Sequence, residues 1–312
     1  MEALNVASRV VFPMALLILL GILVRKTGVI GRPAMEEVNH LAFRVFMPAT
    51  LFKNVYEAQL GRSIAGNEIL FALVCLSVIF LIALFVPPLL IKDQAQSASV
   101  GQGIVRSNYI LFGIAVADAI YGEGNSACVA LLGAIVVPVT SAMAVVTLER
   151  GKNRGASLGR LLLSILKNPI IIAALCAIAC RLVHFEIPAL LYSVIKSVAG
   201  VTTTVCFISL GVGLNFSQLR DNHQPLLLGI LFRLVIIPLI FVPLSVAFGF
   251  RGPQLCALLV LFCAPVAVSS YPMAVSMGAD GPLSGQLVFT TTVLSIATIF
   301  LATFLLSLFG WL

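Results

Sequence analysis

The sequence predicts an all-α integral membrane protein whose ten transmembrane helices form two inverted five-helix repeats. The first observation is composition: 60% of the 312 residues are hydrophobic and 10% are charged, against about 45–50% and about 25% in soluble domains. The second is pattern, because the apolar runs are long and show no strand-like alternation. The third is a repeat of half the chain length, with residues 1–156 and 157–312 as the two units.

The repeat appears at a constant offset of 156 residues, at which the apolar runs superimpose without a gap. Four identical pairs support it: Pro13 with Pro169, Arg25 with Arg181, Pro87 with Pro243, and Gly122 with Gly278. In so apolar a chain, a two-fold repeat is typical of a membrane transporter built from two related halves.

Each transmembrane span needs roughly 20 apolar residues. Spans are expected near residues 8–25, 34–54, 67–91, 100–121, 125–148, 161–183, 189–214, 224–249, 254–277 and 283–309. Segments rich in Gly, Pro and charge separate them, at 28–33, 61–66, 92–99, 121–124, 150–159, 184–188, 220–225, 250–253 and 278–282. These loops are short, so the function is expected to lie within the membrane.

The basic residues predict the orientation. Nine Lys and Arg residues lie in the odd-numbered connections and four in the even-numbered ones, which places the odd connections in the cytoplasm. Both termini then face outside in a multi-pass protein of the plasma (inner) membrane. Because each half has an odd number of spans, the second half is inverted relative to the first.

The net charge of +7 comes from basic residues at the ends of the expected helices. This placement is typical of a protein oriented in a lipid bilayer, so no nucleic-acid partner is expected. All seven cysteines lie in apolar runs and are interpreted as packed small hydrophobes. Neither a CxxC nor a Cys/His cluster is present, so no metal or other cofactor is expected.

Arg106 is the first candidate for chemistry, because it lies in a polar cluster with Asn108 inside the apolar fourth span. Charged residues deep in a span are costly and usually functional. A guanidinium there could clamp a substrate carboxylate through two hydrogen bonds. The alternative is an arginine that snorkels to the cytoplasmic headgroups.

Other ionisable residues within spans have weaker assignments. Asp118, near the outer end of span 4, could bind a proton or sodium ion or could be an interfacial residue. Arg44 in span 2 and Arg233 in span 8 are secondary candidates for substrate binding. For both, the structural alternative is a buried or snorkelling side chain.

Span 9 contains Pro265 and Pro272 with two serines between them, which predicts a helix broken near the middle of the bilayer. Gly113 in span 4 falls opposite Ser269 in the repeat. Interrupted helices at equivalent places in inverted halves indicate a transport site, with N-terminal half-helix ends that favour anions. The candidate binding residues are Arg106, Asn108, Gly113, Pro265, Ser269, Ser270, Tyr271 and Asn39.

Span 10 carries hydroxyl residues, among them Thr291 and Ser295. Such hydroxyls often bond only to carbonyls of their own helix. With Asp118, they are the candidates for an ion site that couples H⁺ or Na⁺ to transport.

Several motifs together resemble the auxin efflux carrier family. They are Asn39 ahead of Pro48-Ala49-Thr50-Leu51-Phe52, Ser209-Leu210-Gly211-Val212-Gly213-Leu214, Arg106-Ser107-Asn108, Tyr121-Gly122-Glu123-Gly124, Ala264-Pro265, and Met277-Gly278-Ala279-Asp280. The chain lacks the long central loop of the long plant carriers, so it is similar to bacterial members, which are permeases for malate, malonate and similar acids. Ala115 departs from the pattern, since many members have a proline there.

The resemblance implies a fold similar to bile acid and sodium/proton carriers, in which spans 4 and 9 cross. Spans 1, 2, 6 and 7 would form a scaffold, and spans 3–5 and 8–10 a transport domain that moves as an elevator. It also implies a homodimer through the scaffold.

The expected function is secondary transport of a small organic anion, a carboxylate such as malate, malonate or an auxin-like acid. The alternatives are a channel or membrane-embedded sensor, or an intramembrane enzyme. An enzyme is disfavoured because the sequence has no HExxH motif or acidic cluster.

Overall fold

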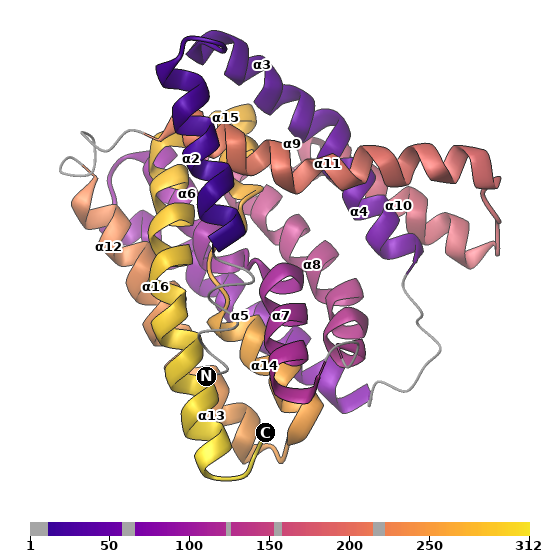
Figure 1. Ribbon diagram of the computed structural model, residues 1–312, viewed down its shortest axis with the longest axis vertical. Helices are drawn as coiled ribbons and strands as arrows, with labels where there is room; N and C mark the ends of the chain where they lie inside the picture. The colour runs from indigo at the N-terminus through magenta and orange to yellow at the C-terminus, as the bar shows by residue number, and fades with distance from the viewer. Residues whose placement is uncertain (1–11, 58–65, 123–125, 153–157, 215–221) are drawn as a thin grey trace.

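A computed structural model describes residues 12–57, 66–122, 126–152, 158–214 and 222–312 (Figure 1). Every named element within these ranges is a helix, and the one β-bridge found there is isolated. The all-α class predicted from the sequence is therefore confirmed. The expected start of the first span at residue 8 lies outside the described residues, as do parts of several expected loops.

The helices of the first half follow the expected spans, except that the fourth begins at Gln94, within the loop expected at 92–99. They are α2 (Phe12–Lys26), α3 (Arg32–Leu41), the π-helical turn η2 (Ala42–Phe46), α4 (Met47–Tyr56), α5 (Gly66–Leu90), α6 (Gln94–Val105), α7 (Tyr109–Tyr121) and α8 (Ala127–Lys152). The segments α3, η2 and α4 run on without a gap as one helix, whereas α6 and α7 are separate pieces of the fourth span.

The second half also contains long helices and a span broken into separate pieces, but its π-helical turn lies in its third span rather than its second. Its helices are α9 (Leu158–Leu166), α10 (Pro169–Leu182), α11 (Ala189–Gly213), α12 (His223–Leu231), η4 (Phe232–Ile236), α13 (Ile237–Ala247), α14 (Gly252–Cys263), α15 (Ser270–Met277) and α16 (Gly281–Leu308). The sixth expected span differs from the prediction, because it is divided into α9 and α10. Asn168 causes the division by capping α10, where its side chain accepts a hydrogen bond from the N–H of Ile170 at 3.0 Å.

In the described residues, five helices are long and apolar enough to cross a bilayer: Gly66–Leu90, Ala127–Gly151, Ala189–Gly213, His223–Ala247 and Gly281–Leu308. Shorter apolar helices cover Tyr109–Tyr121, Pro169–Leu182 and Gly252–Cys263. Large apolar side chains such as Leu89, Leu190 and Leu239 stay exposed on the outer surface, as a lipid-facing protein requires. Together these features define a multi-pass membrane protein.

Two prolines explain the π-helical turns. Pro48 and Pro238 have no N–H, so a regular helical bond cannot form there. The preceding residues bond one position further back: Met47 donates to the carbonyl of Ala42, and Ile237 to that of Phe232. Each helix therefore continues past its proline with a local bulge.

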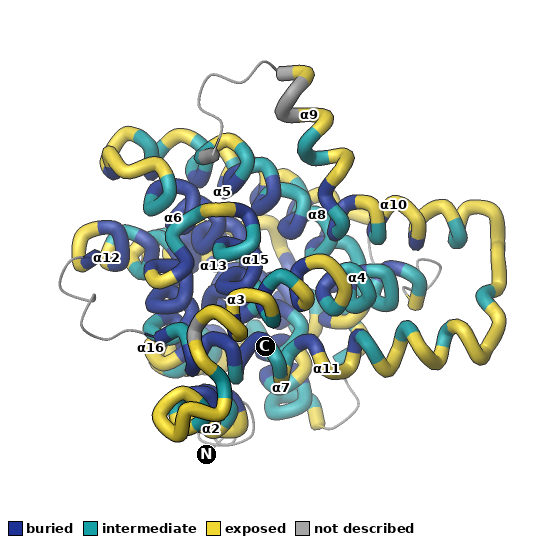
Figure 2. Tube along the Cα trace, turned by 90° about the horizontal axis from the view of Figure 1, so that it is seen from above, coloured by how far each residue is buried: buried dark blue, intermediate teal, exposed yellow. Residues whose placement is uncertain are grey.

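The helices pack as two groups. In one group α2 lies against α11, and α4 lies against both α10 and α11 (Figure 1). In the other, α5, α6 and α8 pack together, as do α7 with α14 and α13 with α14. Figure 2 shows the buried residues concentrated in this second group, while the outer parts of α10 and α11 are largely exposed.

The contact between α2 and α11 depends on two glycines. A Cβ on Gly211 would collide with the carbonyl oxygen of Ile18 and lie 2.9 Å from the Cα of Gly21, and a Cβ on Gly21 would meet Gly211 in the same way. Arg25 extends this contact, donating to the carbonyl of Leu214 at 2.8 Å. Small residues at such crossings let membrane helices approach closely.

Gly211→Ala should therefore destabilise the protein by about 1–3 kcal/mol, the usual cost of overpacking a tight contact. The measurement is the thermal unfolding midpoint of purified protein in detergent. Gly200→Ala on the same helix is the matched control, because a Cβ there meets nothing within 4 Å. Equal midpoints for the two variants would contradict the close crossing.

Candidate functional site

The two helix breaks lie directly against each other. The segment between α6 and α7 and the segment between α14 and α15 pair through an antiparallel bridge of Ser107 with Val266. The N–H of Asn108 donates to the carbonyl of Pro265 at 2.8 Å, and the N–H of Ala267 donates to the carbonyl of Arg106 at 3.3 Å. The breaks expected in spans 4 and 9 are thus present and in contact.

The two breaks have different local causes. In the second, Pro265 holds the preceding Ala264 in an extended conformation (φ −63°, ψ 147°). In the first there is no proline, and Arg106 is itself extended (φ −87°, ψ 114°). Ala115, the position at which the sequence departs from the resemblance described above, lies inside α7 and beyond the break.

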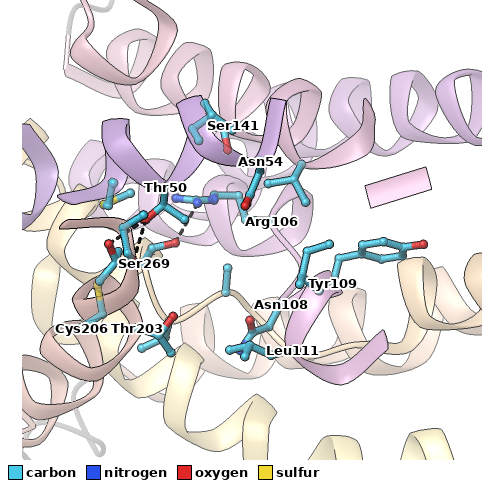
Figure 3. A pocket seen from close by; sticks show the side chains of 18 of the residues that line it. Thr50, Asn54, Arg106, Asn108, Tyr109, Leu111, Ser141, Thr203, Cys206 and Ser269 are labelled. Carbon is cyan, nitrogen blue, oxygen red and sulfur yellow. Dashed lines mark hydrogen bonds between the residues drawn. The ribbon is translucent and has the colours of Figure 1, made fainter. Parts of the chain in front are cut away.

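A cavity of about 300 Å³ lies beside this pairing (Figure 3). It lies between α4, α10 and α11 on one side and α7, α8 and the two breaks on the other. Its polar lining residues are Thr50, Lys53, Asn54, Arg106, Ser107, Asn108, Tyr109, Ser141, Thr202, Thr203 and Ser269. The remainder of the wall consists mainly of aliphatic side chains, with Cys206.

Arg106 is the charged group at the centre of the site. Its side chain is buried, at 7% exposure, and its guanidinium donates to Oγ of Ser269 at 2.8 Å and to Sδ of Met273 at 3.0 Å. Both partners are neutral, and no described carboxylate forms a salt bridge with it. The structure brings Arg106 and Ser269, two of the predicted binding residues, into contact, and the side chain of Arg106 is buried in the protein rather than extended to its surface.

Asn108 adds an unused donor. It stands at the N-terminus of α7, lines the cavity, and its buried side-chain Nδ2 has no hydrogen-bond partner among the described residues. The first turn of α7, from Tyr109 to Leu111, also lies on the cavity wall. Its N–H groups lack partners within the helix and give this end a partial positive charge.

Several predicted binding residues lie outside the cavity lining. A Cβ on Gly113 would collide with Val129, so this glycine allows α7 to pack on α8. Pro265 contributes its carbonyl to the pairing of the breaks. Ser270 is fully buried, and its hydroxyl has no partner in the described structure. The hydroxyl of Tyr271 packs on Gly213.

Asn39 has a role in packing between helices. It is 1% exposed and accepts a short hydrogen bond from Ser209 of α11. Its backbone carbonyl accepts a hydrogen bond from the hydroxyl of Ser276 of α15 at 3.3 Å. The structure thus places it at a junction of α3, α11 and α15.

The three ion-coupling candidates are not brought together around the cavity. Thr291 accepts the N–H of Val266 at 3.1 Å and donates to the carbonyl of Leu287 at 2.6 Å, so it supports the second break. Ser295 donates to the carbonyl of Thr292 at 2.9 Å. Asp118 lies half-buried on α7, outside the cavity lining.

The two secondary arginines differ sharply in their environment. Arg44 lies on η2 with an exposed side chain, outside the cavity lining. Arg233 is 1% exposed and bonds to three backbone carbonyls, those of Ala264, Ile104 and Leu261. Neither reaches the cavity.

The sequence did not single out the polar side of the cavity formed by α4 and α11. Thr50 and Thr202 hydrogen-bond to each other at 2.7 Å, and Asn54 and Thr203 lie near them on the cavity wall. Isolated hydroxyls on apolar helices resemble residues that bond only to their own helix. The signal available was Thr50 itself, which belongs to the Pro48-Ala49-Thr50 motif.

An all-helical membrane protein with two interrupted helices beside a polar cavity has the architecture of a membrane transporter. Residues 6–303 match the model of the membrane transport protein family, which includes the auxin efflux carriers. The chain belongs to this family, and the resemblance found in its motifs is confirmed. No curated protein matches the chain. Membership of a transporter family favours transport over the channel, sensor and enzyme alternatives.

Ser269→Ala should raise the KM of transport about 10- to 100-fold, because it removes the hydrogen bond that positions the charged Arg106 guanidinium, worth about 1.5–3 kcal/mol. Ser270→Ala is the matched control and should leave KM within about twofold, since its hydroxyl makes no hydrogen bond to another described residue. Uptake kinetics in proteoliposomes provide the comparison. The assignment of Ser269 to the site fails if both variants change KM equally.

Proposed function

We propose that the protein is a secondary transporter of a small organic anion with a carboxylate group. The observation that carries the proposal is the buried guanidinium of Arg106 on the cavity wall, whose described hydrogen-bond partners are neutral. A buried charge is costly unless an opposite charge compensates it. A substrate carboxylate would supply that charge and accept two hydrogen bonds from the guanidinium.

The remainder of the cavity suits a small, polar anion. Asn108 offers an unused amide donor, and the N-terminus of α7 adds a partial positive charge. Thr50, Asn54 and Thr203 supply further groups for hydroxyl or carboxyl oxygens. About 300 Å³ is at the lower end of the usual range for small-molecule sites, which favours acids of the size of malate or malonate over larger auxin-like acids.

The proposal includes two inverted repeats, residues 1–156 and 157–312. A symmetric pair of contacts supports it: Arg25 donates to the carbonyl of Val212, and Arg181 to the carbonyl of Tyr56, both at 3.4 Å. Donor and acceptor of the second contact correspond to those of the first at the offset of 156 residues. The bond from Thr202 to the carbonyl of Phe46 spans the same offset.

We also propose that transport proceeds by an elevator motion. The scaffold would comprise α2, α3 to α4, α9, α10 and α11, and the transport domain would comprise α5 to α8 and α12 to α16. The position of the cavity supports this division, because α4 and α11 form one wall and the paired breaks form the other. The energy would come from a gradient or from the electrochemical potential of the substrate itself.

In the cell, the protein would lie in the plasma (inner) membrane with both termini outside, as the distribution of Lys and Arg favours. A homodimer through the scaffold is part of the same proposal.

Arg106→Ala should abolish saturable uptake of the transported acid, lowering kcat/KM about 100-fold or more, as loss of one partner of a buried charge pair does. Proteoliposomes are tested with radiolabelled malate, malonate, succinate, lactate and indole-acetate. The control is Arg44→Ala, an exposed arginine outside the cavity lining, which should transport like the wild type. Uptake that survives in Arg106→Ala would disprove the anion clamp, and absence of any acid uptake would disprove the substrate class.

A covalent link between α3 and α15 should stop the elevator motion. In a variant without the seven native cysteines, Asn39→Cys and Ser276→Cys place thiols on neighbouring segments of α3 and α15, where the hydroxyl of Ser276 donates to the backbone carbonyl of Asn39 at 3.3 Å. Oxidation should abolish uptake, and reduction should restore it. The two single-cysteine variants are the controls. Full transport by the oxidised, cross-linked protein would show that these helices do not move apart.

A further inference from the structure

Arg233 binds the ends of both broken helices from a buried position. Its Nε donates to the carbonyl of Ala264 at 2.7 Å and one terminal nitrogen to that of Leu261 at 2.8 Å, at the C-terminal end of α14. The other terminal nitrogen donates to the carbonyl of Ile104 at 3.3 Å, in the last turn of α6. One guanidinium therefore joins the two half-helices that enter the breaks.

These carbonyls are chemically a cation site. The C-terminal end of a helix carries a partial negative charge, and its last carbonyls have no partner within the helix. In transporters with discontinuous helices, such ends coordinate the coupling ion. Here the side chain that occupies them is a fixed positive charge, which cannot be deprotonated at physiological pH and cannot leave.

Among the described residues, Arg233 has no counter-charge that would make it half of an ion pair. No described carboxylate forms a salt bridge with it, and its titratable neighbour is the thiol of Cys263. The nearby hydroxyl of Thr291 is engaged with Leu287 and Val266. The three carbonyls are therefore the groups that the positive charge of Arg233 stabilises.

We infer that Arg233 is a built-in substitute for the coupling cation, so that the substrate anion crosses without a co-transported sodium ion or proton. The inference rests on the proposed function for the negative charge of the substrate. The cation site itself is a property of the two helix ends and does not depend on the substrate. Arg233 is accordingly a positioning residue: it holds the breaks in place while Arg106 faces the cavity.

The first test uses the wild-type protein in proteoliposomes with the acid that it transports. Initial uptake should be the same in sodium and in choline buffer and should not require an inward proton gradient. It should increase with a membrane potential that is positive inside, because the anion carries uncompensated charge. Several-fold stimulation by sodium or by a proton gradient would overturn the inference.

The second test needs no substrate. Arg233→Ala leaves the three carbonyls exposed to a small cation, so its thermal midpoint in detergent should rise when sodium or guanidinium replaces choline, while the wild-type midpoint should not. Arg233→Lys should restore part of the lost stability without that response. Arg251→Ala is the control, since Arg251 also donates to backbone carbonyls, those of Val246 near the end of α13 and of Phe250, but is exposed.

The outcomes separate this inference from the proposed function. A response to cations in Arg233→Ala alone supports the inference even if none of the tested acids is transported. A folded Arg233→Ala that ignores both cations overturns it, even if Arg106 proves essential for uptake. If the alanine variant does not fold, Arg233→Gln takes its place, with the same two outcomes.

Discussion

The antiparallel pairing of the two helix breaks is the interaction on which the remainder of the structure depends. A helix interrupted inside the membrane frees backbone groups that hydrocarbon cannot satisfy. The bonds from Asn108 to Pro265 and from Ala267 to Arg106 satisfy some of these groups and fix the half-helices α6, α7, α14 and α15 relative to one another. Because Arg106 is itself part of the pairing, the position of the cavity follows from it.

The C-terminal and N-terminal helix ends at the breaks have different surroundings. The C-terminal ends of α6 and α14 are closed by Arg233, which donates to carbonyls of both. The N-terminal end of α7 lies on the cavity wall beside Asn108 and Arg106. The negative ends thus meet a permanent cation, whereas a positive end faces the space where a substrate would bind. This difference in polarity is the physical basis for an anion site.

The features that could be predicted from the sequence are those that depend on composition and on proline. Long apolar runs predicted the helices. Pro265 predicted the second break, because proline restricts the backbone conformation of the preceding residue and has no N–H to donate. The predictions were wrong for residues whose role is decided by three-dimensional packing. Tyr271 and Gly113 were both expected in the binding site, but Tyr271 covers Gly213 and Gly113 makes room for Val129. No local pattern distinguishes a glycine near a ligand from one beneath a neighbouring helix.

The mid-span arginines show most clearly what sequence alone leaves undetermined. Arg44 and Arg233 each lie on a π-helical turn shortly before a proline, so their local sequences look alike. One is exposed and the other is 1% exposed, because only the turn in span 8 faces the breaks. Arg106 and Arg233 are both buried, yet one donates to side chains beside a cavity and the other to backbone carbonyls. Arg233 donates to the carbonyls of helix ends, whose partial negative charge is a permanent part of the structure. Arg106 is held by a serine and a methionine, and its positive charge is left for an anion to balance.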